Sequence, residues 1–206
     1  MNSKSHWETV YETRPADAVS WYAPHLQRSL GYVLRAAQGK ASPVIDIGGG
    51  ESTLVDDLLA EGFSDLTVLD ISAKALDVTR DRLGSAAEKV RWLTADLLDA
   101  PLEARRYEVW HDRAVFHFLT TEEQKRRYVA RVRHSLMPGG FAIVATFGPE
   151  GPAQCSGLPV SRYAAPELHS TFGAPFRLVD SSTEVHTTPW GTPQQFVYCF
   201  CRHADQ

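Results

Sequence analysis

The sequence has few cysteines and no long apolar run. Its three cysteines are an odd number and form no paired cluster, which excludes a disulfide framework and a typical zinc site. No run approaches the roughly 18 apolar residues of a membrane span. The opening residues, MNSKSHWETVYE, also lack the apolar stretch of a signal peptide. These absences predict a cytoplasmic protein with no membrane partner, and free thiols fit that reducing compartment.

An excess of basic charge is also missing. The chain has 21 Lys and Arg against 25 Asp and Glu, a formal net charge of −4. Nucleic-acid-binding domains usually carry a basic surface, so no nucleic-acid partner is expected. A length of 206 residues suits one domain and is short for two. We predict a single domain over residues 1–206, with a helical cap segment at 1–40, a core at 41–147 and a closing part at 148–206.

From Val44 onward, short apolar runs alternate with segments of helical periodicity. This alternation is typical of a parallel sheet covered by helices on both faces. Runs rich in β-branched and aromatic residues predict strands at 44–48, 66–70, 90–95, 107–112 and 141–147. Helices are expected at 52–60, at 72–83, at 166–172 and at 120–135, where Thr120 and Glu123 form a capping box and residues 138–140 end the helix.

The C-terminal third lies outside that alternation. Residues 148–165 are rich in Gly and Pro and predict a loop, and a loop of this length is more often functional than idle. Two apolar runs, FRLVDSSTEV and QFVYCFCR, flank a turn-rich stretch and predict an antiparallel hairpin. The expected fold is therefore α/β: a doubly wound, Rossmann-like, seven-stranded sheet with an antiparallel terminal strand.

The stretch PVIDIGGGESTLVDDLL joins a strand to a helix through three consecutive glycines. Such a turn brings backbone N–H groups close to a phosphate or a nucleoside cofactor. A dinucleotide turn needs G-x-G-x-x-G, and Thr53 stands at its third glycine position. A phosphate-binding P-loop needs a following Gly-Lys-Ser/Thr, which is absent. The turn alone does not identify the ligand.

Further features resemble the class I S-adenosylmethionine-dependent methyltransferases. That family has an acid at the end of the first strand followed by G-x-G, here Asp46 with Gly48 and Gly50. Asp70 ends the second strand, where the family has its ribose-binding acid, and Asp96 follows the third strand, where the family meets the adenine amino group. The resemblance covers residues 40–206 and implies S-adenosylmethionine as the cofactor.

The roles of these residues follow from their chemistry. Asp70 can accept hydrogen bonds from both ribose hydroxyls, and Asp96 from an exocyclic amine. Asp46 would meet the cofactor's ammonium, while Gly48 and Gly50 leave room for its amino-acid part. Ile71 and Leu97, which follow two of the acids, belong to the predicted cofactor site, as do Asp112 and Arg113 and the aromatic side chains Trp7, Tyr11 and Trp21.

The segment after the fourth strand faces the methyl group in this family. His117 is our candidate for a base or orienting group, with simple packing between two phenylalanines as the alternative. For Asp112 and Arg113 the alternative is an internal ion pair. No metal site is predicted, because His111, Asp112 and His117 have no further ligand at a convincing spacing.

The acceptor is predicted to be a small molecule, methylated by in-line displacement at the sulfonium methyl. A protein-lysine methyltransferase is one alternative, since a mildly acidic surface suits a basic protein substrate. A thiol or metalloid methyltransferase that uses Cys155 is another. A nucleoside-binding regulator without catalysis and a nicotinamide oxidoreductase are the remaining hypotheses. The N-terminal segment and residues 148–165 are expected to shape the choice of acceptor.

Overall fold

A seven-stranded sheet forms the centre of the molecule. The computed structural model describes residues 3–204; residues 1–2 and 205–206, the outermost ends of the predicted cap and closing parts, lie outside the described residues. The strands are arranged in the order β3-β2-β1-β4-β5-β9-β8. They span Val44–Ile47 (β1), Leu66–Asp70 (β2), Val90–Thr94 (β3), Tyr107–Arg113 (β4), Leu136–Phe147 (β5), Phe176–Thr187 (β8) and Pro193–His203 (β9).

The direction of the strands confirms the predicted fold class. Strands β1 to β5 are parallel to one another, and β9 is antiparallel to both β5 and β8. The antiparallel strand is thus the last in the chain and the last but one in the sheet. The carboxyl ends of β1, β2, β3 and β4 meet at one edge, where ligands bind in open parallel sheets.

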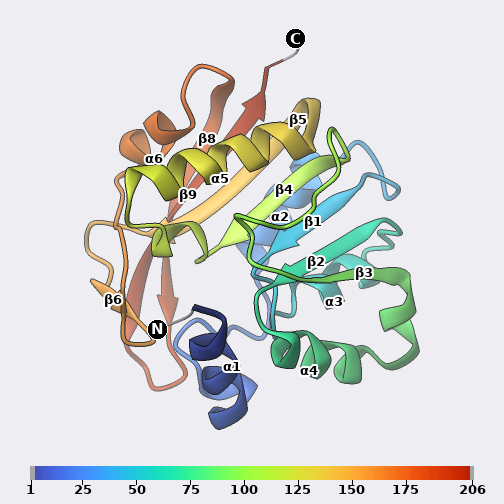
Figure 1. Ribbon diagram of the computed structural model, residues 1–206, viewed down its shortest axis with the longest axis vertical. Coiled ribbons are helices and arrows are strands. Elements are labelled where there is room, and N and C mark those ends of the chain that lie inside the picture. Colours follow the sequence, from blue (N-terminus) through green and yellow to red (C-terminus); the bar gives the residue numbers. More distant parts are fainter. Residues whose placement is uncertain (1–2, 205–206) are drawn as a thin grey trace.

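Helices cover both faces of the sheet. Figure 1 shows α5 and α6 in front of the sheet and α2 and α3 behind it. One apolar core includes residues of α2, α3 and α4, and a second core on the opposite face includes residues of α5 and α6. In the part of the chain that the structure describes, no helix is both long and apolar enough to cross a bilayer. The helices span Ser3–Thr13 (α1), Gln27–Ala36 (α2), Leu54–Ala60 (α3), Ala73–Leu83 (α4), Glu122–Ser135 (α5) and Ala165–Phe172 (α6), with short 3-10 helices at Ala16–Ala18, Gly84–Lys89 and Phe116–Phe118.

The N-terminal cap differs from the expectation of continuous helix. Helix α1 lies beside α4 at one end of the molecule (Figure 1), whereas α2 packs on the sheet. Between them, residues 19–26 are not helical. Two prolines, Pro15 and Pro24, and several polar residues in and before this stretch interrupt the helical pattern. The segment therefore carries its aromatic residues on two separate pieces of backbone.

The capping box of α5 is one residue later than predicted. The Thr121 hydroxyl accepts from the Gln124 backbone N–H at 3.3 Å, and the Gln124 side chain accepts from the Thr121 N–H at 3.2 Å. The sequence has two adjacent threonines, Thr120 and Thr121, and each is followed three residues later by Glu or Gln. Either threonine can therefore form the capping box. The helix ends at Ser135, and β5 already begins at Leu136, so the Pro-Gly-Gly at 138–140 belongs to the strand.

The predicted loop at 148–165 contains a small hairpin. Gln154–Cys155 (β6) pairs with Leu158–Pro159 (β7). The turn between them has positive φ at Ser156 and Gly157, +49° and +76°. This hairpin fixes the position of Cys155 at the carboxyl edge of the sheet.

Candidate functional site

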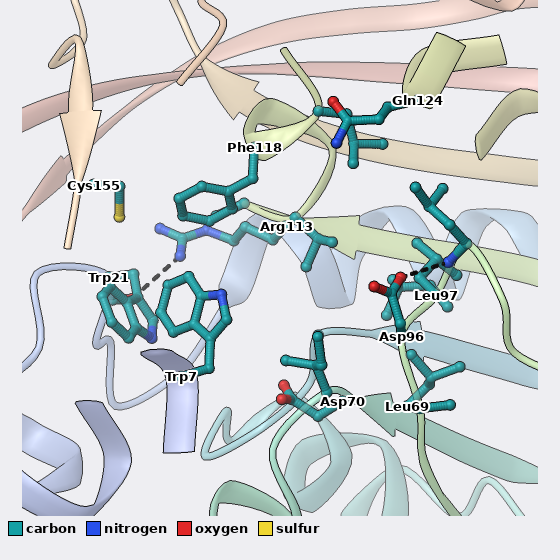
Figure 2. A pocket seen from close by; sticks show the side chains of 18 of the residues that line it. Trp7, Trp21, Leu69, Asp70, Asp96, Leu97, Arg113, Phe118, Gln124 and Cys155 are labelled. Carbon is teal, nitrogen blue, oxygen red and sulfur yellow. Dashed lines mark hydrogen bonds between the residues drawn. The ribbon is translucent and has the colours of Figure 1, made fainter. Parts of the chain in front are cut away.

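A pocket opens at the carboxyl edge of the sheet (Figure 2). Its cavity has a volume of about 210 Å³. The walls come from the ends of four parallel strands and from four segments that pack over them. The lining residues are Trp7, Tyr11, Trp21, Ile47, Gly48, Leu69, Asp70, Ile71, Ala95, Asp96, Leu97, Leu98, Arg113, Ala114, Val115, Phe118, Leu119, Gln124 and Cys155. Nine of the twelve predicted cofactor residues are among them: Trp7, Tyr11, Trp21, Gly48, Asp70, Ile71, Asp96, Leu97 and Arg113.

Asp70 lies on the floor of this pocket without a cationic partner among residues 3–204. One carboxylate oxygen accepts from the Ser72 backbone N–H at 2.8 Å. Burial raises the pKa of Asp70 to about 7, because the ionised form loses its hydration. A buried carboxylate that lacks a cation is suited to hydroxyl donors, such as those of a ribose.

Asp96 lies across the pocket from Asp70, as Figure 2 shows. Its Oδ1 accepts from the Leu98 backbone N–H at 2.9 Å, which closes a turn directly after β3. The apolar side chains of Leu69 and Leu97 also line the pocket, near Asp96. An apolar slot with one carboxylate at its rim has the chemistry needed for an adenine ring and its amino group.

The glycines of the turn make room mainly for the protein's own side chains. Gly48 has φ +64°, and a Cβ there would lie 2.1 Å from Cγ2 of Val115. Gly50 has φ +38° and does not line the pocket; its added Cβ would lie 2.9 Å from Oδ2 of Asp70 and 3.1 Å from the Tyr11 hydroxyl. At Gly50 the missing side chain thus leaves room for Asp70 and Tyr11, and its role beside the ligand stays a prediction.

Asp112 is wholly buried and does not line the pocket. Its carboxylate accepts from the Val115 backbone N–H at 2.9 Å and from the Tyr128 hydroxyl at 2.7 Å. Burial raises the pKa of Asp112 to about 6, against these hydrogen bonds. The structure thus contradicts both interpretations of Asp112, as a pocket residue and as an ion pair with Arg113, because its side chain closes the turn after β4.

Arg113 is half-buried and lines the pocket. It donates to the Trp21 carbonyl at 3.2 Å, and its guanidinium lies 4.1 Å from the centre of the Phe196 ring. Its Nε is buried and has no hydrogen-bond partner among the residues that the structure describes, and none of the ion pairs within residues 3–204 includes it. A guanidinium in this state is prepared for an anionic group.

A second, smaller pocket adjoins the first on the side of the glycine turn. Asp46 and Glu51 line it, together with Arg113. Burial raises the pKa of Glu51 to about 7, with Arg82 acting in the opposite direction. Two acids and one guanidinium complement the ammonium and carboxylate of an α-amino acid. The residues shared by both pockets are Tyr11, Trp21, Ile47, Gly48 and Arg113.

His117 does not line either pocket. Its side chain is wholly buried, its ring lies 4.7 Å from the Phe147 ring, and both ring nitrogens lack a hydrogen-bond partner within residues 3–204. Burial, and secondarily the charge of Arg113, lowers its pKa to about 3. The structure does not support His117 as a catalytic base, because the ring is neutral, weakly basic and shielded from the cavity.

The end of the pocket away from Asp96 is aromatic. The ring of Trp7 lies 5.8 Å from Trp21 and 5.1 Å from Phe118, in edge-on contacts. Cys155 lines the same end, as Figure 2 shows. Burial raises the pKa of its thiol to about 11, so it stays protonated at neutral pH.

The other two cysteines are not part of this site. Cys199 and Cys201 are buried in the core on the face of the sheet opposite the core that contains Cys155. Their sulfur atoms lie 3.0 Å apart on one face of β9. A metalloid held by several thiolates therefore has no support in this arrangement, since Cys155 stands alone in the pocket and is a thiol.

Helix α1 is fixed over the pocket by Glu8. The Glu8 carboxylate accepts from the Ser72 hydroxyl at 2.7 Å and from the backbone N–H groups of Ala73 and Lys74 at 3.0 and 3.3 Å. It thus satisfies free donors at the N-terminus of α4. The same helix presents Trp7 and Tyr11 to the pocket. The wall of the pocket is consequently complete only when α1 is docked on α4.

Several lining residues were not predicted from the sequence. Val115, Phe118 and Leu119 follow β4 in the segment expected to face the methyl group, so a signal for them existed. Gln124 has no such signal, because it reaches the pocket from the first turn of α5. Glu51 follows the glycine turn directly and was detectable as a polar side chain at the sheet edge.

Comparison with known proteins gives relatives of one kind. A family profile described as "Methyltransferase domain" matches residues 44–140. The zebrafish (Danio rerio) protein named EEF1A lysine methyltransferase 2 is 30% identical over 160 residues, which are 71% of this chain and 69% of the relative. The mouse (Mus musculus) eEF1A lysine and N-terminal methyltransferase is 26% identical over 146 residues, 68% of this chain but only 21% of that longer protein.

Solved structures share the whole architecture at low sequence identity. One comes from a study titled "Conversion of a Disulfide Bond into a Thioacetal Group during Echinomycin Biosynthesis"; it has a TM-score of 0.78 and 18% identity, and the match covers 98% of this chain and 93% of the other. The 1,6-didemethyltoxoflavin-N1-methyltransferase of Burkholderia thailandensis, with bound S-adenosylhomocysteine, has a TM-score of 0.74 and 22% identity, covering 98% and 87%. These two likenesses concern the fold.

Proposed function

Because the chain belongs to the class I S-adenosylmethionine-dependent methyltransferases, we propose that it methylates the side-chain amine of a lysine in a protein. S-adenosylmethionine is its cofactor, and when bound it supplies an electrophilic methyl group on a sulfonium. The described residues suit this cofactor: a buried, cation-free Asp70, an apolar slot beside Asp96, and a guanidinium without a counter-ion. The lysine acceptor is the part of this function that we propose.

We assign the ends of the cofactor as follows. Asp70 accepts from the ribose hydroxyls, and Asp96 with Leu97 holds the adenine. Arg113 takes the carboxylate of the amino-acid part, and Asp46 takes its ammonium from the side of the second pocket. In this arrangement the sulfonium lies between Asp70 and the aromatic end of the cavity.

The aromatic end of the pocket is the observation that supports an amine acceptor. The Trp7 ring packs edge-on against Trp21 and against Phe118 at this end of the pocket, and we place the acceptor beside these rings. Aromatic faces attract alkylammonium groups, and an apolar channel fits the four methylene groups of a lysine. The narrow entry excludes water and aligns the nucleophile, which is the main demand of an in-line displacement.

The relatives favour this alternative over our first prediction of a small-molecule acceptor. The names of the zebrafish and mouse relatives specify lysine methylation of eEF1A. The first of these relatives aligns over 69% of its own length. A lysine amine loses its proton to water before attack, and Asp70 and Cys155 need not act as bases.

Methyl transfer to purified elongation factor of the eEF1A type tests the proposal. We expect labelled methyl to appear on lysine, located by mass spectrometry, with release of S-adenosylhomocysteine. Phe118→Leu should reduce turnover with the protein substrate by about tenfold, a loss of about 1.4 kcal/mol, while cofactor affinity stays within about twofold. Leu34→Ala, which changes an exposed side chain on α2, is the control. Turnover of free amines or thiols but of no protein would contradict the lysine acceptor.

A further inference from the structure

A chain of hydrogen bonds leads from the strand before the glycine turn to the edge strand β8, along the face of the sheet that α2 covers. Asp46 Oδ1 lies 2.7 Å from Nδ1 of His111, and Nε2 of His111 lies 2.8 Å from the Ser29 hydroxyl. Ser29 lies 3.1 Å from the Tyr198 hydroxyl, which donates to Glu184 at 3.2 Å. We call these five residues the relay. They come from β1, β4, α2, β9 and β8.

Counting protons gives the charge at which every link of the relay is a hydrogen bond. It has four links, and each link needs one proton. Both ends are carboxylates, which only accept when ionised. With a neutral imidazole, His111, Ser29 and Tyr198 supply three protons in all, so one contact would bring two lone pairs together. A fourth proton, on the second ring nitrogen of His111, satisfies all four links.

The extra proton belongs on the imidazole rather than on Asp46. Either position satisfies the 2.7 Å contact between them. An imidazole is the stronger base, and its cation then lies between Asp46 and the dipoles that lead to Glu184. We propose that His111 is a doubly protonated imidazolium in the ligand-free protein, and that it acts as a positioning residue that holds Asp46 ionised beside the cofactor site.

The other charged groups around the relay agree with this state. Asp112 follows His111 on β4, and the charge of His111 acts to lower its pKa. Arg28 of α2 lies 4.0 Å from the second oxygen of Glu184. Arg113 acts on Tyr198 from the next position of β4. Within the described residues, the carboxylates Asp46, Asp112 and Glu184 thus surround one imidazole and two guanidinium groups.

The relay couples the cofactor to a proton, an inference that rests on the proposed role of Asp46. The ammonium of the bound cofactor would bring a second cation to the carboxylate that His111 already neutralises. Two cations that share one carboxylate repel each other, so we expect His111 to give up its second proton when the cofactor binds. Affinity for S-adenosylhomocysteine should then rise with pH, by at most roughly tenfold per pH unit.

The first test is nitrogen NMR of the histidine rings in ligand-free protein near neutral pH. We expect two protonated ring nitrogens for His111, assigned by their loss in His111→Gln. Glu184→Gln should leave one bare ring nitrogen, because a neutral amide, unlike a carboxylate, can donate to Tyr198, and all four links are then satisfied with a neutral imidazole. Asp180→Asn, which neutralises another acid of the same strand, should match the unaltered protein. A bare nitrogen in the unaltered protein, or no change in Glu184→Gln, would overturn the proposal.

The second test is calorimetry in buffers of different ionisation enthalpy. Binding of S-adenosylhomocysteine should release up to one proton in the unaltered protein and in Asp180→Asn, and none in Glu184→Gln. The nucleoside 5′-methylthioadenosine, which has no amino-acid part, should release none. Proton release that is equal for both ligands would overturn the coupling. If S-adenosylhomocysteine does not bind at all, the proposed function fails, while the NMR test of the imidazolium still stands.

Discussion

Burial of the Asp70 carboxylate lowers the stability of the ligand-free protein at neutral pH. Its pKa is raised to about 7 from 3.8, so the folded protein keeps its proton at a pH where the unfolded chain has lost it. The contribution of this group to stability is present in full below about pH 3.8 and is lost as the pH rises toward 7. The protein accepts a destabilised carboxylate where the ribose is expected.

Asp70→Asn should therefore separate stability from binding. In thermal melts without ligand, the variant should be more stable than the unaltered protein at pH 8, with a much smaller difference near pH 4, because only the ionised carboxylate is penalised. Affinity for S-adenosylhomocysteine should fall by about 1–3 kcal/mol, measured by calorimetry. Equal affinity in the two proteins would mean that the ribose lies elsewhere.

His117→Leu should leave catalysis intact. The imidazole is buried without hydrogen bonds, so an apolar side chain of similar size removes an unsatisfied group. We expect unchanged turnover, an unchanged pH profile and equal or higher thermal stability. A loss of turnover beyond about tenfold with normal cofactor affinity would restore His117 as a functional residue.

Single residues also show how far the sequence leads. Asp70 and Asp96 were predictable because the end of a parallel strand places a side chain at the ligand edge. Asp112 also ends a strand, yet its partner Tyr128 comes from α5, and no local pattern reveals that contact. The burial of His117 was not predictable for the same reason, because Phe147, which packs on its ring, comes from the end of β5.

The docking of α1 depends on the side chain of Glu8. Partial burial opposes ionisation of Glu8, but hydrogen bonds from Ser72, Ala73 and Lys74 outweigh it and lower its pKa. The docking energy of α1 from this group is therefore present above the ordinary pKa of 4.5 and is lost as the pH falls through the lowered value. The helix should loosen in mild acid.

Glu8→Ala should weaken cofactor binding although Glu8 lies outside the pocket. Loss of a carboxylate that caps α4 costs about 1 kcal/mol and frees Trp7 and Tyr11 from the site. We expect a three- to tenfold loss of S-adenosylhomocysteine affinity and faster hydrogen exchange in α1. Glu12→Ala, on the exposed side of α1, should change neither. Equal effects of both substitutions would show that helix propensity, not docking, matters.

Element boundaries were predicted less well than the elements themselves. The sheet follows from its apolar runs, because the inner parallel strands β1, β2 and β4 are buried on both faces. The start of α5 was displaced by one residue, since Thr120 and Thr121 are equivalent as sequence and only packing distinguishes them. The long polar helix α5 was found from Tyr128 and Val132, which are both buried.

For the whole molecule, one pocket built from eight segments predicts one cooperative unit. The strands of the sheet are continuous from β3 to β8, and both apolar cores lie against it. S-adenosylhomocysteine at about 100 times its Kd should stabilise the fold by about 2.7 kcal/mol. For a chain of this size the Tm should rise by roughly 5–11 °C in a single transition. Two transitions, or an unchanged Tm in folded protein, would contradict this expectation.

The contact between Gly48 and Val115 sets a limit on how the pocket can vary. A single methyl group on the turn would overlap the side chain after β4, and the positive φ of Gly48 adds strain. The wall of the cofactor site at Gly48 and the wall of the acceptor site at Val115 are thus in direct contact. An acceptor pocket cannot be widened from Val115 without loosening the turn, so changes of substrate in this scaffold should arise at Phe118, Gln124 and the Cys155 hairpin.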